Sequence, residues 1–208
     1  MNRKAFTLVE MLVVISIILV LSGLLGAGFS KARVMAKRAK AKNDISQLGD
    51  ALRAYYAEYD TWPTYANNTV PPNRLTLNEL QALYQILGGV DRALDTTVTG
   101  VGNPKQIVFL QPSLAEMKTV IDTGGNLYSV GASAVTNWVD PWDRSYMVML
   151  DSTGSGKTVA YGITVGSPPI VPCGFAIWSA GPDMKVNDAE TSLTDSQTEN
   201  KDNLTSWK

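Results

Sequence analysis

An uncharged apolar run near the N-terminus constrains this chain more than any other feature. Residues 11–30 contain no ionisable side chain. At ~1.5 Å per helical residue such a segment is about 30 Å long, which matches the hydrocarbon core of a bilayer. Glu10 stands just before the run and would cost roughly 2–3 kcal/mol to hold in lipid without a partner. The run predicts a membrane-spanning helix whose one carboxylate has a purpose other than anchoring.

The residues before the run form a very short basic leader, MNRKA. A secretory signal has an apolar region of about 7–15 residues with a small-residue cleavage site after it. Here the apolar run is longer, and the small residue, Ala5, stands before it. Cleavage between Ala5 and Phe6 would therefore leave the apolar helix on the mature protein, with a free amine at Phe6.

Residues 3–10 (RKAFTLVE), followed by MLVVI, resemble the class III leader of type IV pilins and type II secretion pseudopilins. In that family a membrane prepilin peptidase cuts before the Phe and methylates the new amine. The Glu five residues into the mature chain then pairs with the amine of a neighbouring subunit in a helical filament. The resemblance implies processing at Ala5 and Phe6 and assembly through Phe6 and Glu10. Ala5 replaces the usual Gly, and a small side chain should still fit the peptidase.

Composition agrees with a small exported protein. With 208 residues and a net charge of −1, the chain has room for one soluble domain and no global attraction to nucleic acid, so no nucleic-acid partner is expected. The chain has no His, and no nucleophile stands in a recognisable catalytic setting. Cys173 is alone, so no intrachain disulfide forms. We expect no enzyme.

Charge is uneven along the chain after the apolar run. Six basic residues precede the next acid, Asp44: Lys31, Arg33, Lys37, Arg38, Lys40 and Lys42. The positive-inside rule would place this cluster in the cytoplasm, whereas Arg3 and Lys4 favour the opposite orientation. The resemblance implies a bacterial inner-membrane protein with a cytoplasmic N-terminus and a periplasmic domain. The cluster would then face anionic headgroups, acidic patches of neighbouring subunits, or solvent.

One helix is predicted from Phe6 to Tyr59, apolar all round in its first half and amphipathic in its second. The apolar stripe of the second half consists of Ile45, Leu48, Leu52, Tyr55 or Tyr56, and Tyr59. A second helix is predicted over residues 77–87, with Thr76 and Glu79 as a capping box and Gly88-Gly89 at its end.

The remaining chain predicts a small antiparallel sheet. Residues 90–139 read as loop-rich, with 107–110 as a short extended piece. Residues 146–150 and 159–165 read as a hairpin, and 175–178 as a third strand. The fold class is α+β and pilin-like, with the long helix packed on the sheet. The expected parts are a leader (1–5), a filament-core helix (6–30), its amphipathic continuation (31–62) and a globular domain (63–208).

Two further segments resemble the major pseudopilin of type II secretion. DPWDRSY (residues 140–146) is similar to its Asp-Pro-Trp-Gly-x-x-Tyr signature, with Asp143 in place of the Gly. WSAGPD (residues 178–183) resembles its Ser-x-Gly-x-Asp segment, which opens a calcium-binding loop closed by acids before a terminal Trp. The tail DNLTSW (residues 202–207) fits that ending.

The resemblance implies one Ca²⁺ bound between these last two segments. Asp183 and Asp202 would supply carboxylates, and the carbonyls near Ala180 and Leu204 further oxygens. Asn203 stands where a second Asp is common. Independently, the acidic loop between Asp183 and Asp202 offers the hard oxygens that calcium prefers. The alternative is a disordered acidic tail.

These patterns favour a structural subunit of a type II secretion pseudopilus. Its expected partners are other copies of itself, the prepilin peptidase, the inner-membrane secretion platform and, before assembly, membrane lipid. Two alternatives stay open: a type IV pilus subunit, and an uncleaved membrane-anchored binding domain in which the unmatched middle segment binds a ligand.

Overall fold

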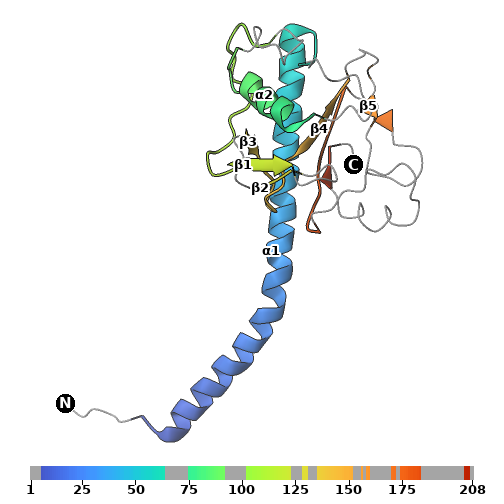
Figure 1. Cartoon of the computed structure of the whole chain (residues 1–208). Coiled ribbons are helices and arrows are strands. Elements are labelled where there is room, and N and C mark those ends of the chain that lie inside the picture. The colour runs from blue at the N-terminus through green and yellow to red at the C-terminus, as the bar shows by residue number, and fades with distance from the viewer. Residues whose placement is uncertain are drawn as a thin grey trace, which may run out of the picture. The chain divides into compact units, whose positions relative to one another are not determined.

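The computed structural model describes residues 6–63, 75–91, 102–122, 128–130, 135–151, 156, 158–159, 170–171, 174–183 and 204–206. Figure 1 shows the helices and strands in chain order. The chain divides into two compact units, Met1–Lys37 and Arg38–Lys208, and each is described by itself.

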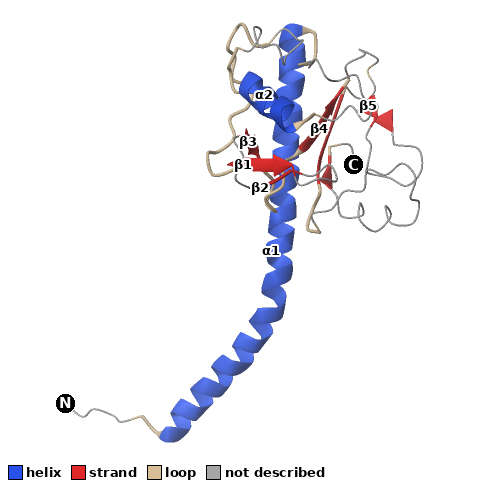
Figure 2. Ribbon diagram, viewed as in Figure 1, coloured by secondary structure: helices blue, strands red, loops and turns tan. Residues whose placement is uncertain are grey.

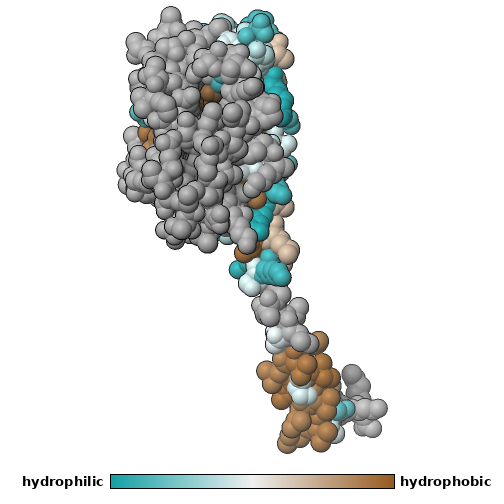
Figure 3. Space-filling model, turned by 90° about the vertical axis from the view of Figure 1, so that its right-hand side faces the viewer, coloured by the Kyte–Doolittle hydropathy of each residue, from teal (hydrophilic) through white to brown (hydrophobic). Residues whose placement is uncertain are grey.

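Helix α1 (Leu8–Tyr59) is 52 residues long and ends at the predicted residue (Figure 2). It stops where Asp60 adopts a positive φ of 52°, which breaks the helical backbone. In the first unit its side chains from Leu8 to Leu21 are exposed, and Figure 3 shows this surface as hydrophobic. Across the part of α1 whose side chains are described, which omits residues 24–28, no stretch is long and apolar enough to cross a membrane. The membrane-spanning segment stays a prediction.

The second half of α1 supplies one wall of the domain core. Ile45, Leu48, Leu52 and Tyr55 are all at most 3 % exposed, whereas Tyr56 is 39 % exposed. The predicted amphipathic stripe is therefore confirmed, and it passes through Tyr55. Spacings of three and four place these side chains on one face of the helix, where they pack against the strands of the domain.

Helix α2 (Leu77–Leu87) has the predicted bounds and the predicted cap. The backbone N–H of Thr76 donates to the Glu79 carboxylate at 2.7 Å, and the Glu79 N–H donates to the Thr76 hydroxyl at 3.5 Å. These reciprocal bonds satisfy amide groups that have no partner within the helix. The N–H of Gly88 closes the other end on the Tyr84 carbonyl at 2.8 Å.

The first sheet corrects the expectation that residues 90–139 are mainly loop. Strands β1 (Met117–Asp122), β2 (Tyr128–Val130) and β3 (Val135–Trp138) form an antiparallel sheet in the order β2-β1-β3. Helix α2 packs against β3. The glycines in this part of the sequence favoured a prediction of loop. Short strands gain their stability by pairing with one another, and a local pattern does not show that pairing. Residues 107–110 form no strand.

The second sheet has the order β4-β7-β8, formed by β4 (Met147–Leu150), β7 (Phe175–Ser179) and β8 (Leu204–Thr205). Strand β4 pairs with β7, Met147 opposite Trp178 and Leu150 opposite Phe175, and most of the predicted hairpin of residues 146–150 with 159–165 lies outside the described residues. Every residue of β4 and β7 is buried. Of 159–165 only Val159 is described; it belongs to β5 (Thr158–Val159), which pairs with β6 (Ile170–Val171).

The fold class is confirmed: a long N-terminal helix with small antiparallel sheets, in a pilin-like α+β arrangement. The core cluster joins α1, α2 and the second sheet through Leu48, Leu52, Leu83, Val148 and Ile177. Each of these side chains is fully buried.

Candidate functional site

A reciprocal set of hydrogen bonds caps the start of α1. The N–H and hydroxyl of Thr7 donate to one Glu10 carboxylate oxygen at 2.8 and 2.7 Å, and the Glu10 N–H donates to the Thr7 hydroxyl at 3.2 Å. This is a capping box, and it holds a negative charge where the helix dipole favours one. In the single chain, Glu10 therefore has a local partner.

The sequence contains this cap as the pattern Thr7-Leu8-Val9-Glu10, whereas the resemblance implies only pairing of Glu10 between subunits. The same Thr-x-x-Glu spacing that identified the cap of α2 identifies this one. Phe6 directly precedes the cap and its side chain is 72 % exposed. Ala5, the other predicted processing residue, lies outside the described residues.

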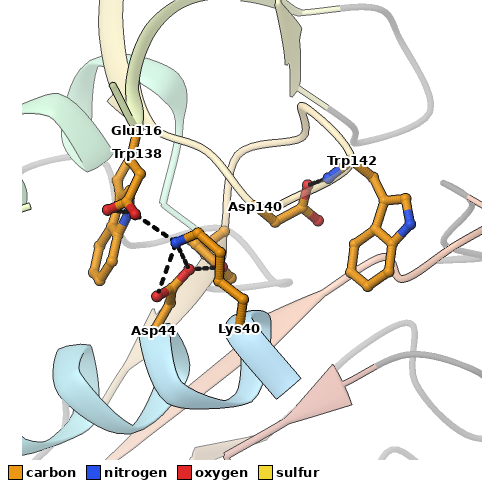
Figure 4. A network of polar contacts seen from close by, with 7 residues as sticks. Lys40, Asp44, Glu116, Trp138, Asp140 and Trp142 are labelled. Carbon is orange, nitrogen blue, oxygen red and sulfur yellow. Dashed lines mark hydrogen bonds and ion pairs between the residues drawn. The ribbon is translucent and has the colours of Figure 1, made fainter. Parts of the chain in front are cut away.

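A buried carboxylate connects residues 140–146 with residues 178–183, the two segments that resemble the major pseudopilin. Asp140 is 2 % exposed. One of its oxygens accepts the N–H groups of Trp142 and Arg144, both at 2.9 Å, and the other accepts the Ser179 hydroxyl at 2.6 Å (Figure 4 shows the bond to Trp142). Burial raises the pKa of Asp140, and the three donors oppose that shift only in part. Asp140 thus fixes the 140–144 turn to the end of β7.

The C-terminal strand brings part of the predicted calcium site together. Leu204 pairs with Ser179, and Thr205 pairs with Trp178. Two further bonds hold the tail there: the Ser206 N–H donates to the Ile177 carbonyl at 2.9 Å, and the Ile177 N–H donates to the Ser206 hydroxyl at 3.1 Å. Leu204 therefore lies beside the residue that precedes Ala180.

The other predicted calcium ligands are described only in part. Asp183 is exposed, three residues after buried Ala180. Asp202 and Asn203 lie outside the described residues. Within the described ranges no three His, Cys, Asp or Glu side chains cluster as metal ligands. The chemistry of Asp183 and of the neighbouring backbone carbonyls, all hard oxygen donors, nevertheless fits calcium.

A second polar network fastens α1 to the domain (Figure 4). The Lys40 ammonium donates to Asp44 at 3.1 Å and also to Glu116, which lies just before β1. Asp44, 3 % exposed, accepts the Tyr146 hydroxyl at 2.8 Å, and Glu116 accepts the Trp138 indole N–H at 3.2 Å.

This network separates Lys40 from the rest of the basic cluster. Partial burial lowers the pKa of Lys40, but its bonds to Glu116 and Asp44 outweigh that effect and the pKa is raised. The bond from Lys40 in turn lowers the pKa of Glu116. Of the readings left open for the basic cluster, none described Lys40 correctly, because its partners belong to its own domain. No local pattern connects Lys40 with Glu116, which is 76 positions away in the chain.

The segment without a sequence resemblance contains a pocket of about 460 Å³ between α2 and residues 108–117. Its walls carry no charged side chain. Amides of Gln81, Gln85 and Gln111 stand beside apolar groups that include Tyr84 and Met117. The volume is within the range of small-molecule sites.

Comparisons with known proteins agree with the N-terminal geometry. Residues 1–26 match the family described as the prokaryotic N-terminal methylation motif. The type IV major pilin protein PilA of Myxococcus xanthus is 30 % identical over 66 residues, which are 32 % of this chain and 30 % of the length of PilA. The similarity thus covers under a third of that relative. No solved structure matches the chain significantly. The methylation motif, the similarity to this pilin and the long N-terminal helix support a likeness to the pilin-like and pseudopilin family.

Proposed function

We propose that this pilin-like chain is a structural subunit of a type II secretion pseudopilus. The observation that carries the proposal is the capped start of α1, where Phe6, Thr7 and Glu10 stand together at the head of a 52-residue helix. The subunit is anchored by this helix in the bacterial inner membrane, with its domain in the periplasm. The prepilin peptidase removes residues 1–5, and the inner-membrane secretion platform assembles the subunits.

The geometry suggests how Glu10 works in such a cycle. In a single chain, Thr7 supplies two donors to the carboxylate, which lessens the cost of a charge near lipid. In the filament, the amine of Phe6 in a neighbouring subunit supplies the opposite charge. The bonds from Thr7 carry a charge on the acceptor alone, whereas the bond from the amine joins two opposite charges, so the intersubunit pair competes well with Thr7.

Secretion is favoured over a pilus role by the two C-terminal resemblances, DPWDRSY and WSAGPD. The Asp140–Ser179 bond at 2.6 Å connects these segments, so they act as one structural unit. We further propose that one Ca²⁺ binds beside this unit, held by Asp183, Asp202 and Asn203 with carbonyls near Ala180 and Leu204. The metal supplies a cross-link between the acidic tail and the end of β7.

The proposal is tested by two substitutions of one residue. Glu10→Gln keeps the capping box, since Gln serves at this position as Glu does, but removes the charge. Glu10→Leu removes both. Each variant should insert in the membrane at least as well as the parent, and each should lose most filament assembly, measured by sedimentation of sheared filaments. Assembly of Glu10→Gln at the parental level would contradict charge pairing between subunits.

The pocket beside α2 favours a second candidate, an uncleaved anchored domain that binds a small uncharged ligand. The two candidates differ at the N-terminus. Mass spectrometry of the protein from its native membrane should find a methylated Phe6 as the first residue of a pseudopilin. An intact Met1 in that material would favour the anchored binding domain.

A further inference from the structure

The basic residues that directly follow the apolar run are the strongest charged feature outside the sites described above. Lys31, Arg33 and Lys37 belong to the first unit and are exposed. The chain has no acidic residue between Glu10 and Asp44. Lys40, the basic residue nearest the domain network, is bound to Asp44 and Glu116. The three residues are called the basic collar here.

The three basic residues lie within an arc of about 160°, which is nearly half of the helix circumference. With 3.6 residues per turn, each residue advances about 100°. Arg33 and Lys37 therefore lie about 200° and about 240° round the helix from Lys31. An acidic patch on one neighbouring protein would face one side of the helix only, whereas a membrane surface surrounds a helix that enters it. An arc of this width suits either partner, so the apolar residues beside the basic ones distinguish the two.

The apolar residues among the collar favour lipid headgroups. Phe29, 61 % exposed, lies under the Arg33 guanidinium, whose carbon is 4.5 Å from the ring centroid. Met35 is 59 % exposed. An aromatic ring and long basic side chains close to the end of an apolar segment suit the interface between hydrocarbon and water, where basic side chains extend their charges to the headgroups.

We propose that the basic collar binds anionic phospholipid headgroups of the leaflet that faces the globular domain. The inference rests on the proposed membrane anchoring and adds a lipid partner of stated charge. It also accounts for a basic cluster on the side of the membrane that the positive-inside rule disfavours. Bound headgroups neutralise the three cations before the subunit enters the filament. Assembly then has to release these headgroups.

The test measures transfer of the detergent-solubilised full chain into vesicles, followed by flotation. Vesicles of phosphatidylcholine alone are compared with vesicles that also contain phosphatidylglycerol. The collar variant is Lys31→Gln/Arg33→Gln/Lys37→Gln, since Gln keeps helix propensity. The control, Arg53→Gln/Lys105→Gln/Lys118→Gln, removes the same charge from surface ion pairs of the domain.

The parent and the control should favour the anionic vesicles, and the collar variant should lose that preference by up to about a hundredfold. High salt should abolish the preference in the parent. An equal loss in the control would overturn the proposal, as would a parent that enters both vesicles equally. A collar variant with normal lipid preference but lost self-assembly would instead assign the collar to a protein partner. A parent that enters neither vesicle would refute the anchoring itself.

Discussion

Asp143 adopts a backbone conformation that residues with a side chain rarely adopt. Its φ is 64°, in the left-handed region, at the position where the similar family signature has Gly. Asp tolerates this region better than most residues because its short polar side chain bonds locally. Its carboxylate also accepts a bond from Lys118. Asp in place of Gly therefore makes the backbone conformation of this turn less favourable, but it adds a surface ion pair with Lys118.

Two substitutions of Asp143 separate these effects. Asp143→Gly and Asp143→Ala both remove the ion pair, which is worth up to about 1 kcal/mol at such exposure. Only Ala keeps the strain of a positive φ. We expect the Ala variant to be less stable than the Gly variant by about 1 kcal/mol in urea unfolding. Equal stability of the two would mean that the turn relaxes to another conformation.

Glu116 makes the domain sensitive to acid. Its pKa is lowered from the ordinary 4.5, chiefly by the bond from Lys40. Because the pKa is lower in the folded chain than in the unfolded one, the stabilising contribution is complete above about pH 5 and is lost as the pH falls through the lowered pKa. The melting temperature of the parent should therefore fall on acidification.

Glu116→Gln removes this titration and keeps an acceptor for Lys40 and for the Trp138 indole. The variant should lose less stability than the parent between about pH 5 and pH 3, by up to about 1 kcal/mol because the pair is partly exposed. Parallel melting curves of parent and variant across that range would show that other carboxylates control the acid response.

The helices could be predicted closely because their signals are local. The Thr76–Glu79 cap and Gly88 stand within one turn of the ends of α2, and the stripe of α1 repeats at three and four residues. The strands carried no such information about partners. β4 pairs with β7, 25 to 31 residues away by the register. Both strands are buried on every residue, and burial is a property of the folded domain that a local pattern does not contain.

Thr76 gives a direct measure of how much a local signal contributes. Thr76→Ala removes the hydroxyl that accepts the Glu79 N–H, and loss of such a cap typically costs about 1 kcal/mol. Thr76→Ser keeps the oxygen and should stay within a few tenths of a kcal/mol of the parent. Urea unfolding measures both. If Ala and Ser variants unfold at the same denaturant concentration, tertiary packing alone determines the start of α2.

At the scale of the whole molecule, some parts of the candidate site could be predicted from the sequence and others could not. Resemblance identified the leader, the 140–146 segment and the 178–183 segment, and the structure joins the last two through Asp140 and Ser179. The sequence did not predict the Lys40–Asp44–Glu116 network or the pairing of the tail as β8, because these contacts connect positions far apart in the chain. Asp44 and Tyr146, 102 positions apart, meet only after the sheet has formed on α1.

The predicted calcium site acts at the scale of the whole domain, because it would fasten the C-terminal tail to the second sheet. Calcium that binds only the folded chain stabilises it by ~2.7 kcal/mol at a hundredfold excess over the dissociation constant. Chelation should therefore lower the melting temperature of the full chain in detergent, and added calcium should restore it. Asp183→Ala should reproduce the loss and abolish the response to calcium.

Asp50→Ala is the matched control, since Asp50 is an exposed acid whose partner is Arg53 on the same helix. That variant should keep the full calcium response. The neutral amide of Asn203 lowers the ligand charge, so the response should appear at higher calcium concentrations than an all-carboxylate site requires. A melting temperature of the parent that neither calcium nor chelator changes would refute the site. Strand β8 and the bond from the Ile177 N–H to the Ser206 hydroxyl would then be the attachment of the tail.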